Sequence, residues 1–527
     1  MFILALPAFA NITSGSLTGR VQVTGAPARG VTVTAESTVL QAPRTTITDA
    51  DGRYWLGELP PGTYDVTFSL PAHTTFTKRA IVELARVARA DAVLEPNPDE
   101  DATTSTAIQI SVADTLVPTS HFDDRALDRL PYGRIGSVQL APGFGIAQIL
   151  VDGIPTVLPS EDAIDELTIL PAASPVEWEA LGGNAIVVRT RPSQEELFFT
   201  VRDTITKGFA HYGEATAGGR IVPQRLWFFA GAWGGQHDFP FSDDSDGGLA
   251  KLDAQLGAAH HVNVSYMDAR LDTASIRYTA TAGPNFTSEL IAARVEGYDF
   301  FTGRASYDLG AHLLTGGYTD SGVFFASDRW SSSHWNVYAG LRRDGDDDEL
   351  LPRAALSYDL HGNGRQAITA TWGDYDFDLR VTSLGFATAI GNSGTARADA
   401  IRREAGDGYW QNMLHLDARY RLFDRFEAGA TYALSNQEAI LGALNLEQEA
   451  NVWFGAEIPI ASHEFGATVV QHYFDLNDRN LVPTDIALRY AIPLPRVGLL
   501  LAADATNVFA EERVTPRAWR LWLRVRI

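Results

Sequence analysis

The chain has 527 residues, enough for two or three domains, and 45% of them are hydrophobic. It contains no cysteine, which excludes a disulfide framework and thiolate metal sites. Its formal charge of −23, from 42 basic and 65 acidic side chains, argues against a nucleic-acid partner, because phosphates require a basic face.

The first ten residues have features of an export signal. A short apolar stretch, Phe2–Leu6, precedes Ala8-Phe9-Ala10, which has the small-x-small form of a cleavage site. The usual basic n-region is missing, so either a longer signal begins upstream or the segment is a first strand. We expect residues 1–10 to be a signal peptide.

Residues 11–95 are predicted to form a small β-sandwich. Alternating apolar runs such as Leu17–Val23 and Tyr64–Phe68 are separated by Gly and Pro turns. The stretch Asp49-Ala50-Asp51-Gly52 is predicted to be a hairpin turn, with a Ca²⁺ site as the alternative. The motifs resemble those of the carboxypeptidase regulatory-like domain, a non-catalytic sandwich that often precedes other modules on exported proteins; they are Gly15–Val21, Thr48–Tyr54 and Pro61-Gly62-Thr63-Tyr64.

Residues 96–106 are rich in Pro, Asp, Glu, Thr and Ser and are predicted to be a linker. Residues 107–194 then contain short apolar strands joined by glycine turns. The order of these motifs resembles the plug domain of TonB-dependent outer-membrane receptors, in which a strand ending in an Asp-Gly turn precedes a Gly-Gly segment and a final apolar strand. The matching residues here are Asp152-Gly153, Gly182-Gly183 and Ala185–Thr190.

The resemblance also implies a strand before the plug that contacts TonB. The best match is Asp114, Thr115, Leu116 and Val117, within the segment Asp114–Thr119, and an ordinary plug strand is the alternative interpretation. The plug-like segment is short and lacks the Arg-Gly step that usually precedes the Asp-Gly turn in this family. We therefore expect a reduced or divergent member.

Residues 195–527 are predicted to form a transmembrane antiparallel β-barrel. Leu414–Leu422 and Phe426–Leu434 each alternate apolar and polar side chains and are joined by a minimal turn. No apolar run approaches the roughly 20 residues of a spanning helix, so a membrane crossing must use strands. In such a barrel, lipid would contact the apolar face of each strand and a polar lumen would contact the other face. A soluble sandwich is the alternative interpretation.

The length of this segment allows about 18 to 22 spanning strands with their turns, and the family implies 22. The 10% aromatic content would suit girdles at two membrane interfaces. Four longer loops are expected: Gln236–Gly247, Asp272–Asn285, Thr319–Ser333 and Gly391–Gly408.

The last nine residues are predicted to close the barrel against the first strand, near Leu197–Val201. Alternation places one set of side chains toward lipid: Trp519, Leu521, Leu523, Val525 and Ile527. The other face, toward the plug and lumen, carries Arg520, Trp522, Arg524 and Arg526. The stretch Thr506–Glu512 with Pro516-Arg517 resembles the family's closing motif, although Ile527 replaces its usual terminal aromatic residue.

No Gly-x-x-x-x-Gly-Lys-Ser/Thr, His-Glu-x-x-His or Gly-x-Ser-x-Gly motif is present, so a non-enzyme without cofactor or metal is expected. The adjacent His260 and His261 point to opposite faces of a strand and cannot share one metal. The acidic clusters Asp243–Asp246 and Asp344–Glu349 are predicted to be solvated turns, with cation or basic-ligand sites as the alternative.

The fold class is thus predicted to be all-β: an N-terminal sandwich, an internal plug and an outer-membrane barrel. The resemblance implies import of a surface ligand into the periplasm of a Gram-negative-type bacterium, with the N-terminal domain periplasmic. The expected partners are outer-membrane lipid, the TonB complex, the barrel-assembly machinery and an unknown surface ligand or protein. A structural scaffold barrel in a multiprotein assembly and a passive pore are the alternative functions.

Overall fold

The structure, a computed structural model, describes most of the chain. The described residues are 15–23, 26–37, 43–49, 52–59, 62–71, 73–82, 87–90, 92–94, 105–106, 120–131, 148–170, 176, 185–191, 197–206, 210–223, 225–235, 246–256, 260–282, 286–309, 312–319, 322–332, 334–343, 349–361, 365–375, 378–390, 394–405, 410–422, 425–437, 446–476, 479–494, 497–508 and 518–527. The expected signal peptide lies outside them.

Two five-stranded sheets form the N-terminal part of the chain. One contains β1 (Gly15–Val23), β2 (Ala26–Pro27), β5 (Arg53–Leu59), β8 (Val87–Arg89) and β9 (Ala92–Leu94). The other has the order β10 (Ser105–Thr106), β7 (Phe76–Val82), β6 (Gly62–Ser69), β3 (Thr32–Glu36) and β4 (Arg44–Ile47). Their inward side chains share one apolar core that includes Leu17, Tyr64 and Phe68.

The Asp49 segment is a hairpin turn, as predicted. The Asp49 carboxylate accepts a hydrogen bond from the Arg53 amide at 2.8 Å, and the Gly52 amide donates to the Asp49 carbonyl. Gly52 has φ +72°, and a Cβ there would lie 2.4 Å from the Val21 carbonyl oxygen. Only glycine meets both conditions, so this residue fixes the turn against β1.

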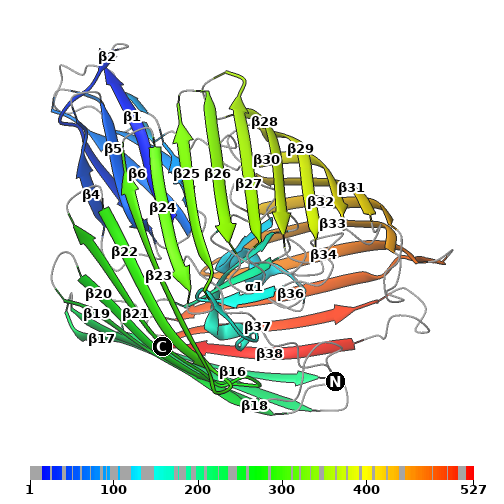
Figure 1. The fold of residues 1–527 in the computed structure, drawn as a ribbon. Helices are drawn as coiled ribbons and strands as arrows, with labels where there is room; N and C mark the ends of the chain where they lie inside the picture. Colours follow the sequence, from blue (N-terminus) through cyan, green and yellow to red (C-terminus); the bar gives the residue numbers. More distant parts are fainter. Residues whose placement is uncertain are drawn as a thin grey trace.

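A third sheet of five strands lies inside the barrel, drawn in cyan in Figure 1. Its order is β11 (Ser120–Asp123), β14 (Ile164–Leu170), β15 (Ala185–Thr190), β12 (Gln148–Val151) and β13 (Ile154–Pro155). The short helix α1 (Asp124–Arg129) follows β11, and the 3-10 turn η2 (Glu161–Ala163) precedes β14. We call residues 120–191 the plug.

A closed antiparallel barrel surrounds the plug (Figure 1). Elements β16 to β38 number 23, but β35 pairs only with the end of β34 while β36 pairs directly with β34, so the wall has 22 strands. This confirms the upper end of the predicted range. The strands are β16 (Phe198–Thr206), β17 (His211–Val222), β18 (Leu226–Gly235), β19 (Gly247–Gln255), β20 (His260–Asp268), β21 (Thr273–Ala282), β22 (Phe286–Val295), β23 (Tyr298–Asp308), β24 (His312–Thr319), β25 (Phe324–Ser331), β26 (Trp335–Arg343), β27 (Leu350–Asp359), β28 (Gln366–Tyr375), β29 (Leu379–Ile390), β30 (Gly394–Glu404), β31 (Trp410–Leu422), β32 (Phe426–Gln437), β33 (Leu446–Ile460), β34 (His463–Leu476), β35 (Arg479–Leu481), β36 (Thr484–Leu494), β37 (Val497–Thr506) and β38 (Ala518–Arg526).

The outer face of the barrel is apolar and the inner face is polar. Outward side chains such as Leu384 and Val452 are exposed, whereas inward ones such as Asp399 and Arg342 are fully buried. Trp410 and Tyr420 lie on the outer face near the two ends of β31. Ten residues of strand span about 33 Å, or about 25 Å along the axis of a barrel with the usual strand tilt, which matches the apolar band of a membrane barrel.

Three of the four predicted long loops are wrong. Asp272–Asn285 contains β21, Thr319–Ser333 contains β25 and Gly391–Gly408 contains β30. The outer faces of β25 and β30 carry several small or polar residues, among them Ala326, Asp328 and Ala398, and therefore lack the apolar alternation that marks a strand. Most of the fourth loop and most of both acidic clusters lie outside the described residues.

Among the described residues, no helix has both the length and the apolar character needed to cross a membrane.

Candidate functional site

The interface between the plug and the barrel wall is the candidate functional site. Apolar side chains contribute part of it: Leu150 and Val187 of the plug belong to one buried cluster with Phe325 and Tyr375 of the wall. Its most specific contacts are ionic and fall into three groups. In most of them a plug carboxylate meets a basic side chain of the wall.

The first group is centred on Glu161 of η2. Arg202 of β16 contacts the Glu161 carboxylate at 2.5 Å, and Arg520 of β38 contacts both of its oxygens at 3.0 and 3.1 Å. Arg520 also binds Asp504 of β37 at 2.7 Å, and the Arg202 guanidinium lies 4.4 Å from the centre of the Trp522 ring. The neighbouring Asp162 is 3.5 Å from Arg202 and from Arg524.

Electrostatics fixes the charge state of Glu161. Burial opposes ionisation and raises its pKa, but Arg520 and Arg202 outweigh burial and lower the pKa from 4.5 to about 2. The carboxylate is therefore charged at neutral pH. Because β16 and β38 are the first and last barrel strands, one plug anion bridges the seam at which the barrel closes.

The second group surrounds the turn between β12 and β13. Asp152 has φ +47° and Gly153 φ +82°, so both occupy the left-handed region that a tight turn requires. The Asp152 carboxylate accepts hydrogen bonds from the amide and the hydroxyl of Thr190. Lys251 of β19 donates to Asp152 at 3.2 Å and to the Thr190 hydroxyl at 2.7 Å, and Arg277 of β21 donates to the Asp152 carbonyl.

The Asp152 carboxylate in this turn is also ionised at neutral pH. Burial raises the pKa of Asp152, but Lys251, Thr190 and Arg277 together hold it below its usual value. Beside the turn, the hydroxyls of Thr156 in the plug and Thr273 in β21 are 2.9 Å apart. The plug is therefore fixed to β19 and β21 through polar contacts only a few residues apart.

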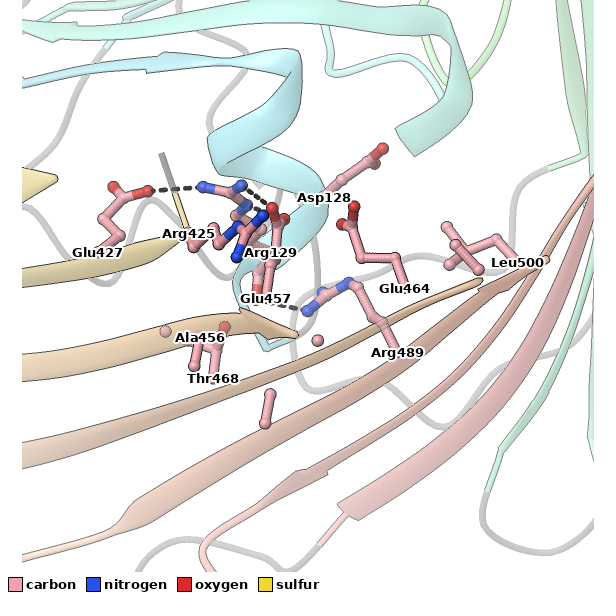
Figure 2. A pocket seen from close by; sticks show the side chains of 14 residues that line it. Asp128, Arg129, Arg425, Glu427, Ala456, Glu457, Glu464, Thr468, Arg489 and Leu500 are labelled. Carbon is pink, nitrogen blue, oxygen red and sulfur yellow. Dashed lines mark hydrogen bonds and ion pairs between the residues drawn. The ribbon is translucent and has the colours of Figure 1, made fainter. Parts of the chain in front are cut away.

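The third group holds helix α1 (Figure 2). Arg129 ion-pairs with Glu427 of β32 at 3.2 Å and with Glu457 of β33. Arg489 of β36 donates to the carbonyls of Arg129 and Leu130 at 2.6 and 2.9 Å, which satisfies carbonyls that the helix end leaves unpaired. Arg524 binds Asp128 at 2.6 Å.

A cavity of about 300 Å³ lies between α1 and the wall strands β32 to β37. Figure 2 shows Glu464 and Asp128 on one side of it and the Arg129 contacts on the other. Its charged lining residues are Asp128, Arg129, Arg425, Glu427, Glu457, Glu464 and Arg489. These residues sit near the rim of the barrel at which β38 ends.

The structure describes some of the residues singled out from the sequence and not others. Asp114, Thr115, Leu116 and Val117 lie outside the described residues, as do Gly182 and Gly183. Asp152 and Gly153 form the turn described above. In β38, the side chains of Trp519, Leu521 and Leu523 are exposed on the outer face. Val525 is partly exposed there, and Ile527 is exposed just after the strand. The strand pairs with residues Thr200–Thr206 of β16.

Sequence reasoning missed the residues that bind the plug from the wall, above all Lys251, Arg277 and Arg202, and it missed Glu161. One signal was available, because Glu161-Asp162 is an acidic pair just before the predicted plug strand that β14 confirms. Within the part of the chain that the structure describes, no group of three or more His, Cys, Asp or Glu side chains could hold a metal ion.

Comparisons with known proteins agree with this architecture. The protein-family model of the carboxypeptidase regulatory-like domain matches residues 16–95. The TonB-dependent transporter Oar of Myxococcus xanthus is 26% identical over 265 residues, which cover 39% of this chain and 25% of that protein. The chain thus matches about a quarter of the length of this relative.

Solved structures resemble the plug and barrel together. The siderophore receptor PirA from Pseudomonas aeruginosa aligns with a TM-score of 0.62 and 11% identity, covering 78% of this chain and 99% of that one. The ferric yersiniabactin uptake receptor FyuA from Yersinia pestis aligns with a TM-score of 0.59 and 10% identity, covering 79% and 98%. At these identities the likeness establishes the fold, and the predicted plug-and-barrel fold with an N-terminal carboxypeptidase regulatory-like domain is confirmed.

Proposed function

We propose that this protein is an outer-membrane receptor that binds a surface ligand and imports it into the periplasm through a plug-gated barrel. The observation that carries the proposal is the ionic character of the plug contacts around Glu161, Asp152 and Arg129. A paired charge in a polar lumen can exchange its partner for water when the plug moves, whereas the apolar cluster of Leu150 and Val187 with Phe325 and Tyr375 opposes opening. A barrel whose plug is held by such ionic contacts is better suited to gated transport than to a passive pore.

The domain organisation in this proposal follows the sequence. Residues 1–10 are a signal peptide, 11–95 a periplasmic regulatory-like sandwich, 96–106 a linker, 107–194 the plug and 195–527 the barrel. The last two linker residues, Ser105 and Thr106, extend the second sandwich sheet as β10, parallel to β7. This pairing leaves a shorter tether between the sandwich and β11.

Energy for opening would come from the TonB complex, contacting Asp114 to Val117. This segment precedes β11, which pairs antiparallel with β14 and leads directly into α1. Tension on it would reach β11 and α1 before the rest of the plug. Deletion of residues 114–119 is expected to abolish uptake while the barrel still assembles, and undiminished uptake would contradict the TonB role.

A cross-link between plug and wall tests the gate itself. Thr156→Cys with Thr273→Cys places two thiols where hydroxyls are 2.9 Å apart, close enough for a disulfide. The control pair is Thr371→Cys with Ser383→Cys, whose hydroxyls are 2.6 Å apart on the neighbouring wall strands β28 and β29. The chain has no other cysteine, so each disulfide forms without competition.

Uptake can be followed without knowing the ligand, by mass spectrometry of the solutes that producing cells remove from a complex growth medium. We expect the cross-linked plug variant to remove none of the solutes taken up by the wild type until a reductant is added. The control pair should behave as the wild type in both conditions. Uptake by the oxidised plug variant would contradict a moving plug.

A scaffold in a multiprotein assembly is the second candidate, favoured by the short connections between strands. Between neighbouring wall strands the longest connections are residues 236–246 and 507–517, eleven residues each. A stable stoichiometric partner after purification from detergent, together with no solute removed by wild-type cells, would favour the scaffold.

A further inference from the structure

Arg202 of β16 is shared by three buried carboxylates. Its guanidinium group lies 2.5 Å from Glu161, 3.5 Å from Asp162 and 3.3 Å from Glu214 of β17. No more than 10% of any of these four side chains is exposed. One guanidinium group carries a single positive charge, so it cannot neutralise three anions.

The three carboxylates differ in their other partners. Glu161 also binds Arg520, and Asp162 lies 3.5 Å from Arg524. The Glu214 carboxylate accepts one further hydrogen bond, from the Asp162 amide at 3.3 Å. Within the part of the chain that the structure describes, Glu214 is therefore the one carboxylate of the three without a second cation.

The remaining neighbours of Glu214 are aromatic. Its register partner on β18 is Trp233, and Tyr212 is the preceding inward residue of its own strand. Trp233 belongs to a buried cluster with Phe198 and Phe229, and Tyr212 packs against this cluster. Burial beside these rings and the two neighbouring anions both oppose a negative charge on Glu214.

We propose that Glu214 holds a proton while the plug is seated and releases it when the plug moves. In the seated state the neutral carboxyl group leaves the charge of Arg202 to Glu161 and Asp162. When η2 leaves the wall, those two contacts are lost and Glu214 becomes the carboxylate partner of Arg202. The Glu214 O–H bond then breaks, and the proton passes to a water molecule in the opened lumen.

The charged and titratable groups around Glu214 come from four elements. They are Arg202 on β16, Tyr212 on β17, Glu161 and Asp162 on η2, and Arg520 and Arg524 on β38. Arg191 of the plug binds the backbone carbonyl of Asp162 at 2.7 Å. Only Arg202 places a positive charge directly on the Glu214 carboxyl group among the described residues.

The proposal rests on the plug movement proposed above and adds a regulation of the same site. One proton is released for each opening, so a rise in pH favours the open state and a fall in pH favours the seated plug. The ratio of open to seated plug therefore changes by up to about tenfold per pH unit where Glu214 titrates.

Infrared difference spectroscopy on the full chain in detergent tests the proton directly, because a protonated carboxyl group has a C=O stretching band that a carboxylate lacks. We expect the wild type to lose such a band as the pH is raised from neutral, and Glu214→Gln to lack this change. Glu289→Gln is the matched control, since Glu289 of β22 is a buried wall carboxylate with two cations of its own. These are Arg277 at 3.2 Å and Arg304 at 2.9 Å. The control should keep the wild-type band.

Tryptic cleavage of the plug in detergent measures the opening. We expect cleavage of the wild-type plug, relative to an unfolded substrate at the same pH, to rise above neutral pH by up to about tenfold per pH unit. Glu214→Gln keeps the shape of the neutral carboxyl group and cannot ionise, so it should show no such rise. Glu289→Gln should show the wild-type rise.

A wild-type spectrum without a carboxyl band that disappears on raising the pH would overturn the proposal, and this result needs no variant. The same spectral change in Glu214→Gln, or the same pH profile of cleavage, would also overturn it. A heat-dependent shift in gel mobility verifies a closed barrel in each variant. Uptake by the oxidised plug variant with Cys at 156 and 273 would count against import alone, because the infrared band does not depend on transport.

Discussion

Arg520 of β38 and Arg202 of β16 bind the same carboxylate, that of Glu161, at 3.0 and 2.5 Å. The two arginines belong to the strands that meet at the barrel seam, and the carboxylate belongs to the plug. This one carboxylate therefore joins the plug to both strands of the seam, beside the contacts that Asp162 makes with Arg202 and Arg524. We infer that a plug without this anion leaves Arg202 with Asp162 and Glu214, and Arg520 with Asp504, as the remaining carboxylate partners at the closing strands.

Glu161→Gln tests this point. The variant leaves Arg202 and Arg520 partly uncompensated, and breaking a buried pair typically costs about 3–5 kcal/mol. We expect tryptic cleavage within residues 120–191 to accelerate in detergent, while the barrel stays resistant. Glu404→Gln removes an exposed wall carboxylate that pairs with Arg402 and should change stability by less than about 0.5 kcal/mol. Equal protease resistance in both variants would show that the plug does not depend on Glu161.

The same carboxylate predicts an acid response. Its pKa is lowered in the folded state, from 4.5 to about 2, so its stabilisation is complete above pH 4.5 and is lost as pH falls toward 2. The lowered pKa of Asp152 acts in the same direction. Plug protection against a protease active in acid should decline as the pH falls below 4.5. Glu161→Gln should show a shallower decline, and an identical pH profile in the variant would assign the acid response to other groups.

The contact between Lys251 and Asp152 can be measured by a double-mutant cycle. Lys251→Met should cost about 3–5 kcal/mol because it leaves a buried carboxylate without its ammonium partner. Asp152→Asn alone should also loosen the turn. The double variant should be more stable than the sum of the two losses implies, because each replacement removes the charge that the other leaves unpaired. Additive losses, measured by plug protection against trypsin, would mean that the two groups do not interact.

Helix α1 is predicted to control leakage through the cavity beside it. Arg129→Ala removes both ion pairs to Glu427 and Glu457 and enlarges a cavity of about 300 Å³. We expect more frequent current openings in planar bilayers than for the wild type. Arg425→Ala removes a side chain from the same cavity without changing those two ion pairs and serves as the control. Equal opening frequencies in the two variants would place the leak path elsewhere.

Much of the barrel could be predicted from the sequence because strand geometry is local. Alternation at Trp519–Ile527 predicted which side chains of β38 face outward, and a strand allows only two faces. Three strands, β21, β25 and β30, were expected to be loops. Alternation is present in β21 at Ala274, Ile276 and Tyr278 and was overlooked, whereas it is obscured in β25 and β30. Residues such as Ala326 and Asp328 on the outer face of β25 hide the pattern, since they carry no apolar signal.

The partners of the inward residues were decided by the tertiary structure. The sequence indicated that Arg520 faces the lumen, but its contact with Glu161, 359 positions away, depends on barrel closure, strand register and the depth of the plug. The same holds for Lys251 and Asp152, which are 99 positions apart. Side-chain direction follows from the backbone of one strand, whereas a contact across the lumen requires the position of every strand between the two residues.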